Sequence, residues 1–465
     1  MAIIKASYTI TPNESTPNGS LWLSDLDQIF RPFHTTLIYI YKPKKENQKN
    51  LTQTLKNSLS KILVPYYPIA GRYSYTKLGR LELNLNAKGA ILLEAETTQT
   101  IHDFGDFSSF DSIKELIPKI DFNQPIEEIP LFVVQLTRFQ NKDENFVAIG
   151  IAYSHSLSDG LGCWNFINSW AKIARGETLE ANELPFLDRT ILKFSHTPLK
   201  PCFEHRELKP LPFILGRSDD NIERKKKTRV ELLKLTRDEV EKLKKKANEC
   251  EISKGSISIS KSRPYSRFEA ISAHIWRSAS KARELNANQL SVVRFNVQIR
   301  NRIVPNLPKN YYGNALIQTE ARGYIGEITS KPLSYAAKKI REGNELIKNE
   351  YIRSQIDVIR GFENLDDARR LFIGGDGKTP TFVGYPNLHI TSWMGFATNE
   401  ADFGWGKPIY FSMGHVTSYD RAIIIKSPDD DASVTVCMHF QVELMQLFKK
   451  FFYEDLYELI TSAKL

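Results

Sequence analysis

The chain has 465 residues, 41% hydrophobic and 25% charged, a globular composition that excludes a disordered or fibrous protein. Lysine and arginine outnumber aspartate and glutamate by 63 to 54, but no nucleic-acid-reading motif accompanies the densest basic run, 224–227, so we expect no nucleic-acid partner. Because the sequence has neither an 18-residue apolar run nor a leader-like start, we expect a cytoplasmic protein with no membrane partner.

The first 100 residues combine short strands with one amphipathic helix. Residues 37–41 are predicted to form a strand. A helix is predicted for 51–63, because leucines recur there at the helical period and Pro65 then breaks the pattern. Residues 80–85 and 91–95 are predicted to be strands that pair with each other.

The most apolar segment of the chain, 146–153, is predicted to be a buried central strand, since it is short and bounded by polar residues. A helix over 160–175 follows it, with its apolar residues on one face and Gly176 as its stop. The next long irregular stretch, 196–228, is polar and rich in proline.

This stretch is predicted to be a crossover loop between two mixed α/β domains, 1–195 and 229–465. The further elements predicted are a strand over 228–235, a helix from the capping box 236–239 to 250, a strand over 433–442 and a helix to about 462. Two domains of similar size would place a ligand in the cleft between them.

His155 is the best candidate for a catalytic residue. It lies between the predicted buried strand and the predicted helix, and Asp159 completes an H-x-x-x-D pattern. A histidine accepts a proton near neutral pH, as a general base must. A second match, His102 to Asp106, has no apolar strand before it and is predicted to be a surface loop. The local sequence leaves two roles open for His155, a general base or a hydrogen-bonded core histidine.

Other catalytic chemistries lack their residue patterns. No histidine or cysteine pair has metal-ligand spacing, so no metal is expected. Phosphate-binding glycine loops and the G-x-S-x-G elbow are also missing from the sequence. Cys163 falls on the apolar face of the predicted helix, where packing explains it better than thiol catalysis. The four cysteines are far apart, and reduced thiols are expected.

Two downstream segments stand out. In Asp402-Phe403-Gly404-Trp405-Gly406, two glycines surround a tryptophan, which is typical of a tight structural turn and offers no good base or nucleophile. Thr391 and Trp393 carry a hydroxyl and an indole N–H that could donate to an oxyanion. A strand with one packed tryptophan is the alternative interpretation of this second segment.

Together these motifs resemble the plant BAHD acyltransferase family. The family's H-x-x-x-D-G matches His155, Asp159 and Gly160, and its D-F-G-W-G matches 402–406 letter for letter, far downstream. The resemblance extends over nearly the whole chain, and further stretches that carry it are 63–72, 312–315 and 386–388.

The resemblance implies an α/β protein with two chloramphenicol-acetyltransferase-like domains and an active-site channel at their interface. It also implies a monomer that uses an acyl-CoA donor as co-substrate and a small amine or alcohol as acceptor, with no permanently bound cofactor. His155 would be the general base, and Asp159 would support the catalytic loop, through Arg300 or Arg302. The other implied roles are oxyanion or acyl-site contact for Thr391 and Trp393, coenzyme A contact for Ser266 and Arg267, and structural support for Asp402, Gly404, Trp405 and Gly406.

Within the family, the chain most resembles spermidine hydroxycinnamoyl transferases, in the stretches 7–12, 223–228 and 452–456. This likeness implies transfer of a hydroxycinnamoyl or related aromatic acyl group to a polyamine. An alcohol, another amine, or a catalytically silent binding protein of the same fold are the alternatives.

The chain departs from the family's patterns at two places. Gln298 replaces the acid of V-D-x-R-x-R. Shikimate- and quinate-using relatives hold the acceptor carboxylate with an arginine upstream of Pro-Asn-Leu, where this chain has only Lys378, a point charge without a bidentate fork. This second departure argues against those two acceptors.

Overall fold

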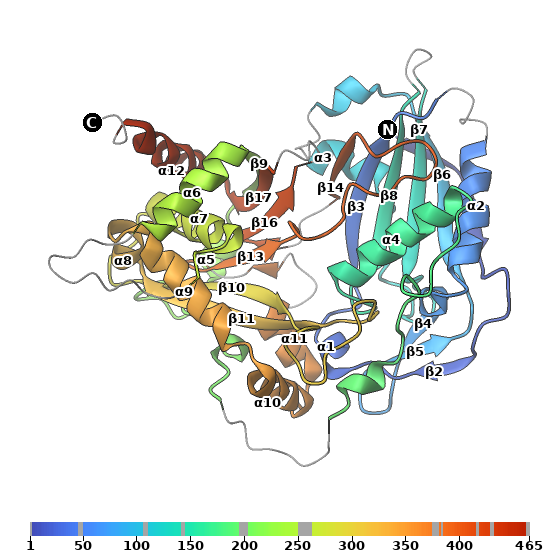
Figure 1. Ribbon diagram of the computed structural model, residues 1–465, viewed down its shortest axis with the longest axis horizontal. Coiled ribbons are helices and arrows are strands. Elements are labelled where there is room, and N and C mark those ends of the chain that lie inside the picture. Colours follow the sequence, from blue (N-terminus) through green and yellow to red (C-terminus); the bar gives the residue numbers. More distant parts are fainter. Residues whose placement is uncertain are drawn as a thin grey trace.

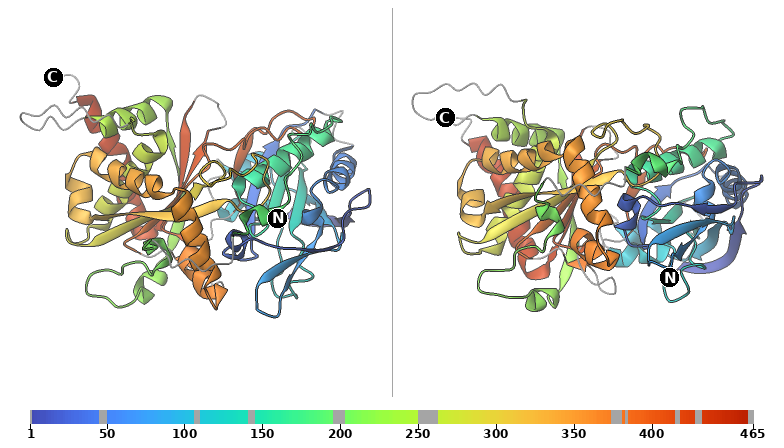
Figure 2. Two further views of the ribbon diagram at one scale, coloured as in Figure 1. Left: turned by 60° about the horizontal axis from the view of Figure 1, so that its bottom comes forward. Right: turned by 90° about the horizontal axis from the view of Figure 1, so that it is seen from below.

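The computed structural model describes residues 2–44, 50–105, 110–140, 145–194, 203–249, 263–373, 381–382, 385–414, 418–427 and 432–461. They form two α/β halves that lie side by side (Figure 1), each built on a six-stranded mixed sheet. The two further views in Figure 2 show the same division. The predicted α/β fold with two sheet-based domains is confirmed.

The first half is centred on a sheet whose edge strands come from opposite ends of the chain. In spatial order its strands are β1 (Ala2–Ile10), β6 (Ala90–Thr97), β7 (Phe132–Phe139), β8 (Val147–Ser154), β3 (His34–Tyr41) and β14 (Tyr410–Met413). The neighbours are antiparallel except β6 and β7. Every residue of β8 is buried, as the apolar run 146–153 predicted.

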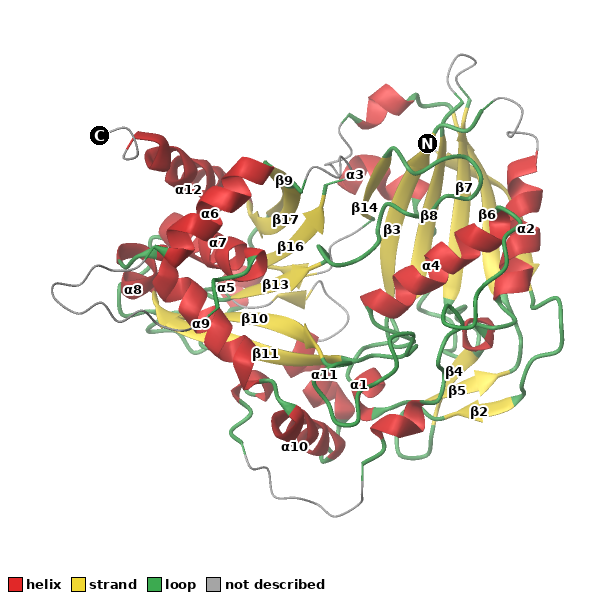
Figure 3. Ribbon diagram, viewed as in Figure 1, coloured by secondary structure: helices red, strands yellow, loops and turns green. Residues whose placement is uncertain are grey.

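Two helices cover one face of this sheet, α2 (Leu51–Ile62) and α4 (Gly160–Ala174), and both were predicted. Figure 3, which colours helices red, shows α4 lying across the strands. The fully buried Trp170 of α4 donates its indole N–H to the Ser58 hydroxyl of α2 at 2.9 Å, which joins the two helices. A smaller cluster around Phe104 and Leu116 packs on the other face.

Residues 80–85 and 91–95 do form strands, but their predicted pairing with each other is wrong. β6 pairs with β1 and β7, whereas β5 belongs to a separate small sheet of β2 (Gly19–Leu21), β5 (Leu81–Leu85) and β4 (Arg72–Tyr75). The turn between them explains the difference. Gly89 has a φ of +87°, which favours glycine, and its N–H donates to the Ala70 carbonyl at 2.9 Å, so the chain turns away into the other sheet.

The second half has a sheet with its helices on one face. Its strands are, in spatial order, β11 (Leu316–Tyr324), β10 (Leu290–Gln298), β13 (Leu388–Ser392), β16 (Arg421–Lys426), β17 (Val434–Gln441) and β9 (Thr228–Leu235). The covering helices are α6 (Arg237–Asn248), α7 (Arg267–Arg283), α9 (Leu333–Leu346) and α12 (Val442–Thr461). The predicted strands over 228–235 and 433–442 and the capping box at Thr236 are confirmed.

The remaining described elements are short or peripheral. They are α1 (Asp25–Gln28), α3 (Phe110–Ile113), α5 (Asn221–Arg224), α8 (Ile325–Ser330), α10 (Asn349–Arg360), α11 (Leu365–Ile373), β12 (Thr381–Phe382) and β15 (Ser418–Tyr419).

One strand crosses between the halves. β14 lies within 229–465, the range predicted for the second domain, yet it pairs antiparallel with β3, with Tyr410 opposite Ile40 (Figure 1). The second half therefore lends a strand to the first sheet. The predicted boundaries 1–195, 196–228 and 229–465 stay predictions about folding units, and residues 196–202 of the crossover lie outside the described part of the chain.

Gly150 on β8 lies where any larger residue would collide with the backbone. A Cβ atom there would be 2.1 Å from the Leu116 carbonyl oxygen. We expect Gly150→Ala to cost ~1–3 kcal/mol of overpacking and to lower the thermal unfolding midpoint by several degrees, measured by calorimetry. Gly361→Ala is the matched control, since its Cβ would lie 3.5 Å from the nearest atoms. Equal midpoints for the two variants would contradict the expectation.

Candidate active site

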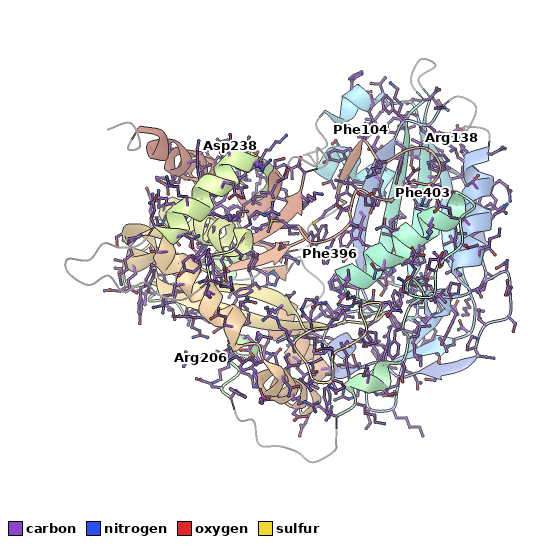
Figure 4. All side chains as sticks on the ribbon, in the orientation of Figure 1. Phe104, Arg138, Arg206, Asp238, Phe396 and Phe403 are labelled. Atoms are coloured by element: carbon purple, nitrogen blue, oxygen red, sulfur yellow. The ribbon has the colours of Figure 1, made fainter. Side chains whose placement is uncertain are left out.

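A cavity of about 790 Å³ lies between the two halves, within the size range of small-molecule sites. The first half contributes the end of β8, the start of α4 and part of β3, and the second half contributes β10, β13 and β16. Phe396, whose side chain lines the cavity, is labelled between the two halves in Figure 4. The cavity occupies the position where two domains were expected to enclose a ligand.

His155 lines this cavity at the end of β8. Its backbone N–H donates to the Phe33 carbonyl at 3.1 Å, and Asn314 Nδ2 donates to its carbonyl at 3.0 Å. The imidazole stacks on the Phe30 ring with centroids 4.2 Å apart and planes 14° apart. The ring is therefore fixed at a wall of the cavity, which is the geometry that a general base requires.

The loop that carries His155 is anchored on both sides. The Ser156 hydroxyl donates to the Phe30 carbonyl at 2.8 Å, and Arg189 Nη2 donates to the Leu157 carbonyl at 2.7 Å. The Ser158 hydroxyl is 2.6 Å from the Tyr153 hydroxyl. These contacts leave the loop little freedom, so the position of the imidazole does not depend on a bound ligand.

Asp159 is saturated by hydrogen bonds. Its carboxylate accepts from Arg300 Nη1 at 2.7 Å and Nη2 at 3.0 Å, from the Ala315 N–H at 3.0 Å and, as the N-cap of α4, from the Gly162 N–H at 3.1 Å. Of the two arginines considered from the sequence, Arg300 makes the pair, while Arg302 donates to Asn344. The contacts hold Asp159 between the two halves, and its role as a support for the loop stays a prediction.

A second buried carboxylate, Asp27, supports the same loop and was missed by sequence reasoning. Asp27 Oδ1 accepts from the Asn314 backbone N–H at 2.8 Å and from its Nδ2 at 3.0 Å, and Asp27 Oδ2 is 3.2 Å from Arg189 Nη1. Asn314 in turn holds the His155 carbonyl. No local pattern signals this network, because its members are up to 287 residues apart.

Burial lowers the pKa of the His155 imidazole to about 4, and the nearby Arg421 charge acts in the same direction. The Asp159 carboxylate opposes the shift only in part. The imidazole is therefore neutral at physiological pH and able to accept a proton.

Thr391 and Trp393 come from β13 and the residue just after it, and both line the cavity. Strand alternation directs these side chains to the face opposite Ile390, which packs under the helices. The Thr391 hydroxyl accepts a hydrogen bond from Arg421 Nη2 at 3.2 Å, and the Trp393 ring packs edge-on against Trp164. Two potential donors thus share the cavity with the imidazole. Their role toward an oxyanion stays a prediction.

Ser266 and Arg267 do not line this cavity. Ser266 is the N-cap of α7, and its hydroxyl and N–H form a capping box with Glu269. Arg267 Nη1 donates to the Ala432 carbonyl at 3.5 Å. The next residue, Phe268, does line the cavity, so α7 begins near its edge. Coenzyme A contact by these two residues stays a prediction.

The segment 402–406 is a turn away from the cavity. Asp402 Oδ1 accepts from the N–H groups of Gly404, Trp405 and Gly406 at 2.8, 3.1 and 2.9 Å, and both glycines have a positive φ, of 95° and 91°. The Phe403 ring packs edge-on against Trp170 of α4 (Figure 4 labels Phe403 beside this helix). The turn attaches the chain before β14 to the first half, and the structural role of this segment stays a prediction.

Two rival chemistries find little support. Burial raises the pKa of the Cys163 thiol well above its ordinary value, so this residue stays protonated although it lines the cavity. His102 lies exposed in a short 3₁₀ helix (Ile101–Phe104), and Asp106 lies outside the described residues.

Within the described chain, no group of three or more potential ligands could hold a metal ion, and no helix is long and apolar enough to cross a membrane.

Comparison with known proteins gives long matches. The transferase family matches residues 2–455. The chain is 41% identical to a hydroxycinnamoyl-CoA:piscidic acid hydroxycinnamoyltransferase of Actaea racemosa, over 98% of this chain and 100% of that one. It is 35% identical to a shikimate O-hydroxycinnamoyltransferase of Nicotiana tabacum and 34% identical to anthranilate N-benzoyltransferase protein 2 of Dianthus caryophyllus, each over 97% of this chain and 99% of the relative.

Solved structures share the fold. Vinorine synthase superposes with a TM-score of 0.70 at 21% identity, over 96% of both chains. F. sporotrichioides TRI101 complexed with coenzyme A and T-2 superposes with a TM-score of 0.69 at 17% identity, over 91% of this chain and 96% of that one.

Removing the negative charge from the Asp159–Arg300 pair should destabilise the protein. Asp159→Asn keeps a helix-capping side chain but leaves the Arg300 charge buried and unpaired, at an expected cost of ~3–5 kcal/mol. Asp159→Asn/Arg300→Met removes both charges and should recover part of the thermal midpoint in calorimetry. A folded Asp159→Asn variant with an unchanged midpoint but a shifted pH–rate profile would instead make Asp159 a participant in proton transfer.

The pH dependence of turnover should follow the lowered pKa of His155. Protonation inactivates a base, so kcat/KM should stay level from pH 8 to about 5 and fall only as the pH approaches 4.

The unfolded chain binds this proton near pH 6.5, so the stability contributed by the neutral imidazole is complete above 6.5 and is lost as the pH falls toward 4. Circular dichroism at each pH separates unfolding from titration, and an acid limb near 6.5 in the folded enzyme would refute the assignment.

Proposed function

Since the chain belongs to the BAHD family of transferases, which use acyl-CoA thioesters as co-substrates, we propose that it transfers a hydroxycinnamoyl or related aromatic acyl group to a small alcohol or amine. The observation that carries this proposal is the position of His155, neutral and fixed at the wall of the cavity between the two halves.

The proposed reaction is direct transfer in a ternary complex. The acceptor's hydroxyl or amino group attacks the thioester carbonyl carbon while its proton passes to His155. The Thr391 hydroxyl and the Trp393 indole N–H donate to the tetrahedral oxyanion. When the intermediate collapses, the carbon–sulfur bond breaks, and the coenzyme A thiolate recovers the proton from the imidazolium. No covalent enzyme intermediate is needed, which agrees with a protonated Cys163.

The charges around the cavity favour an acceptor other than a polyamine. Spermidine would bring ammonium groups that need carboxylate partners. Among the described residues that line the cavity, Asp159 is the only carboxylate, and it is occupied by Arg300, whereas arginines line the walls. Two relatives are named for transfer to piscidic acid and to shikimate, neither of which is a polyamine. The acceptor that we propose is therefore an alcohol or a non-polyamine amine.

The short stretches that resemble spermidine-using enzymes keep polyamine acylation as the second candidate. The expectations of a monomer and of a cytoplasmic location also stay predictions.

His155→Ala should lower turnover at least ~100-fold, since a general base is lost. The assay follows release of coenzyme A thiol from p-coumaroyl-CoA with a panel of shikimate, anthranilate, spermidine and a simple alcohol. His102→Ala is the matched control, because His102 is exposed and does not line the cavity, and it should leave turnover unchanged.

Near-normal turnover of His155→Ala would exclude the mechanism. If the wild-type chain released no thiol with any acceptor, the alternative of a catalytically silent binding protein would be favoured. Turnover of spermidine alone would establish the polyamine candidate.

A further inference from the structure

We propose that Arg421 binds a carboxylate group of the acceptor, so that the acceptor of this enzyme is an organic acid. This inference rests on the proposed acyl transfer and specifies its substrate class. Arg421 was not among the residues singled out from the sequence.

Strand alternation places Arg421 on the cavity side of the second sheet. On β16 the next residue, Ala422, and its i+2 neighbour Ile424 belong to the core beneath the helices. Ile423 faces the opposite way and packs with the first half. Arg421 shares that orientation and lines the cavity. It begins the strand directly beside His389 of β13.

Arg421 differs from three other buried arginines at the centre of the molecule in having no counter-charge. Arg189 pairs with Asp27, Arg283 with Asp420 and Arg300 with Asp159. Among the described residues, by contrast, no carboxylate lies within 4.0 Å of the Arg421 guanidinium, and its Nε is buried without a hydrogen-bond partner. Its hydrogen bond to the neutral Thr391 hydroxyl does not compensate the charge.

A buried cation is costly unless an anion accompanies it. Burial lowers the pKa of Arg421 to about 10, which still leaves the group charged at neutral pH. The neighbouring His389 cannot replace it, because burial and the charges of Arg421 and Arg294 push its pKa well below the ordinary value. This wall of the cavity therefore presents one permanent positive charge, and a ligand carboxylate would neutralise it.

The position suits an acceptor that reacts at His155. The Arg421 charge is near enough to contribute to the lowered pKa of His155, so both side chains line the same region of the cavity. A guanidinium offers parallel N–H donors that match the two oxygens of a carboxylate. A small acid held there would direct its hydroxyl or amino group toward the imidazole.

Lys378, at the position where some relatives carry an arginine, lies outside the described residues. Arg421 supplies a bidentate fork from β16. An arginine at this place could also act on the oxyanion, directly or through Thr391, and the experiment has to separate the two roles.

The test compares acids with their neutral counterparts. Wild type, Arg421→Met and Arg421→Lys are assayed with p-coumaroyl-CoA and two matched pairs, shikimate with methyl shikimate and anthranilate with 2-aminobenzamide. We expect wild type to prefer at least one acid over its neutral counterpart on the order of 10- to 100-fold in kcat/KM. Arg421→Met should abolish that preference by raising KM for the acid, and Arg421→Lys should retain part of it. Turnover of the neutral acceptor by Arg421→Met shows that the variant is folded.

The other outcomes overturn the inference. Equal use of acid and neutral acceptor by wild type would do so, as would a fall in kcat of Arg421→Met for both members of a pair, which would indicate an oxyanion role. His155-dependent turnover of spermidine alone would leave the acyl transfer itself intact, but it would establish the polyamine candidate and refute the acid acceptor. If no acceptor supported thiol release, the proposed function would fail instead, and calorimetric titration of shikimate against methyl shikimate would decide whether Arg421 still selects the acid.

Discussion

The buried pair between Asp159 and Arg300 is the interaction on which the site depends. Asp159 ends the loop that carries His155 and begins α4 in the first half, while Arg300 follows β10 in the second half. Because neither charge tolerates burial alone, the loop reaches its working geometry only when the two halves are docked. Asp27, Arg189 and Asn314 repeat this arrangement from the other side. The cavity and its base are thus products of the interface between the halves.

How much could be predicted from the sequence depended on the range of the interactions involved. β8 and α4 were predicted closely, since an apolar run and a helical period are local signals, and they placed His155 at a strand end. The pairing of 80–85 with 91–95 was predicted wrongly, because the bond from Gly89 to Ala70 that redirects the chain has no local pattern. Thr391 and Trp393 were placed by resemblance, whereas His389, two residues earlier on the same face, was missed.

Arg421 could not be predicted from the sequence as a residue of the cavity. A single cation before the apolar run 422–425 is equally typical of a solvated strand end, and only the fold shows that this end opens on a cavity. For Ser266, coenzyme A contact stays a prediction, and the structure adds a role that the sequence analysis did not name, since its hydroxyl caps α7. The residue type therefore indicates which interactions a side chain can make. Which of them it does make depends on the neighbours that the fold brings to it.

The strand that β14 lends to the first sheet has a consequence for synthesis of the chain on the ribosome. β3 has β8 on one side, but its other edge stays open until residues 410–413 have emerged, long after the rest of that sheet. An unpaired edge strand pairs readily with strands of other chains. The nascent first half therefore has an aggregation-prone edge at β3 through most of translation. Because β14 covers this edge only after residues 410–413 have been synthesised, the first sheet is protected late. A chain truncated before β14 would keep the edge of β3 exposed.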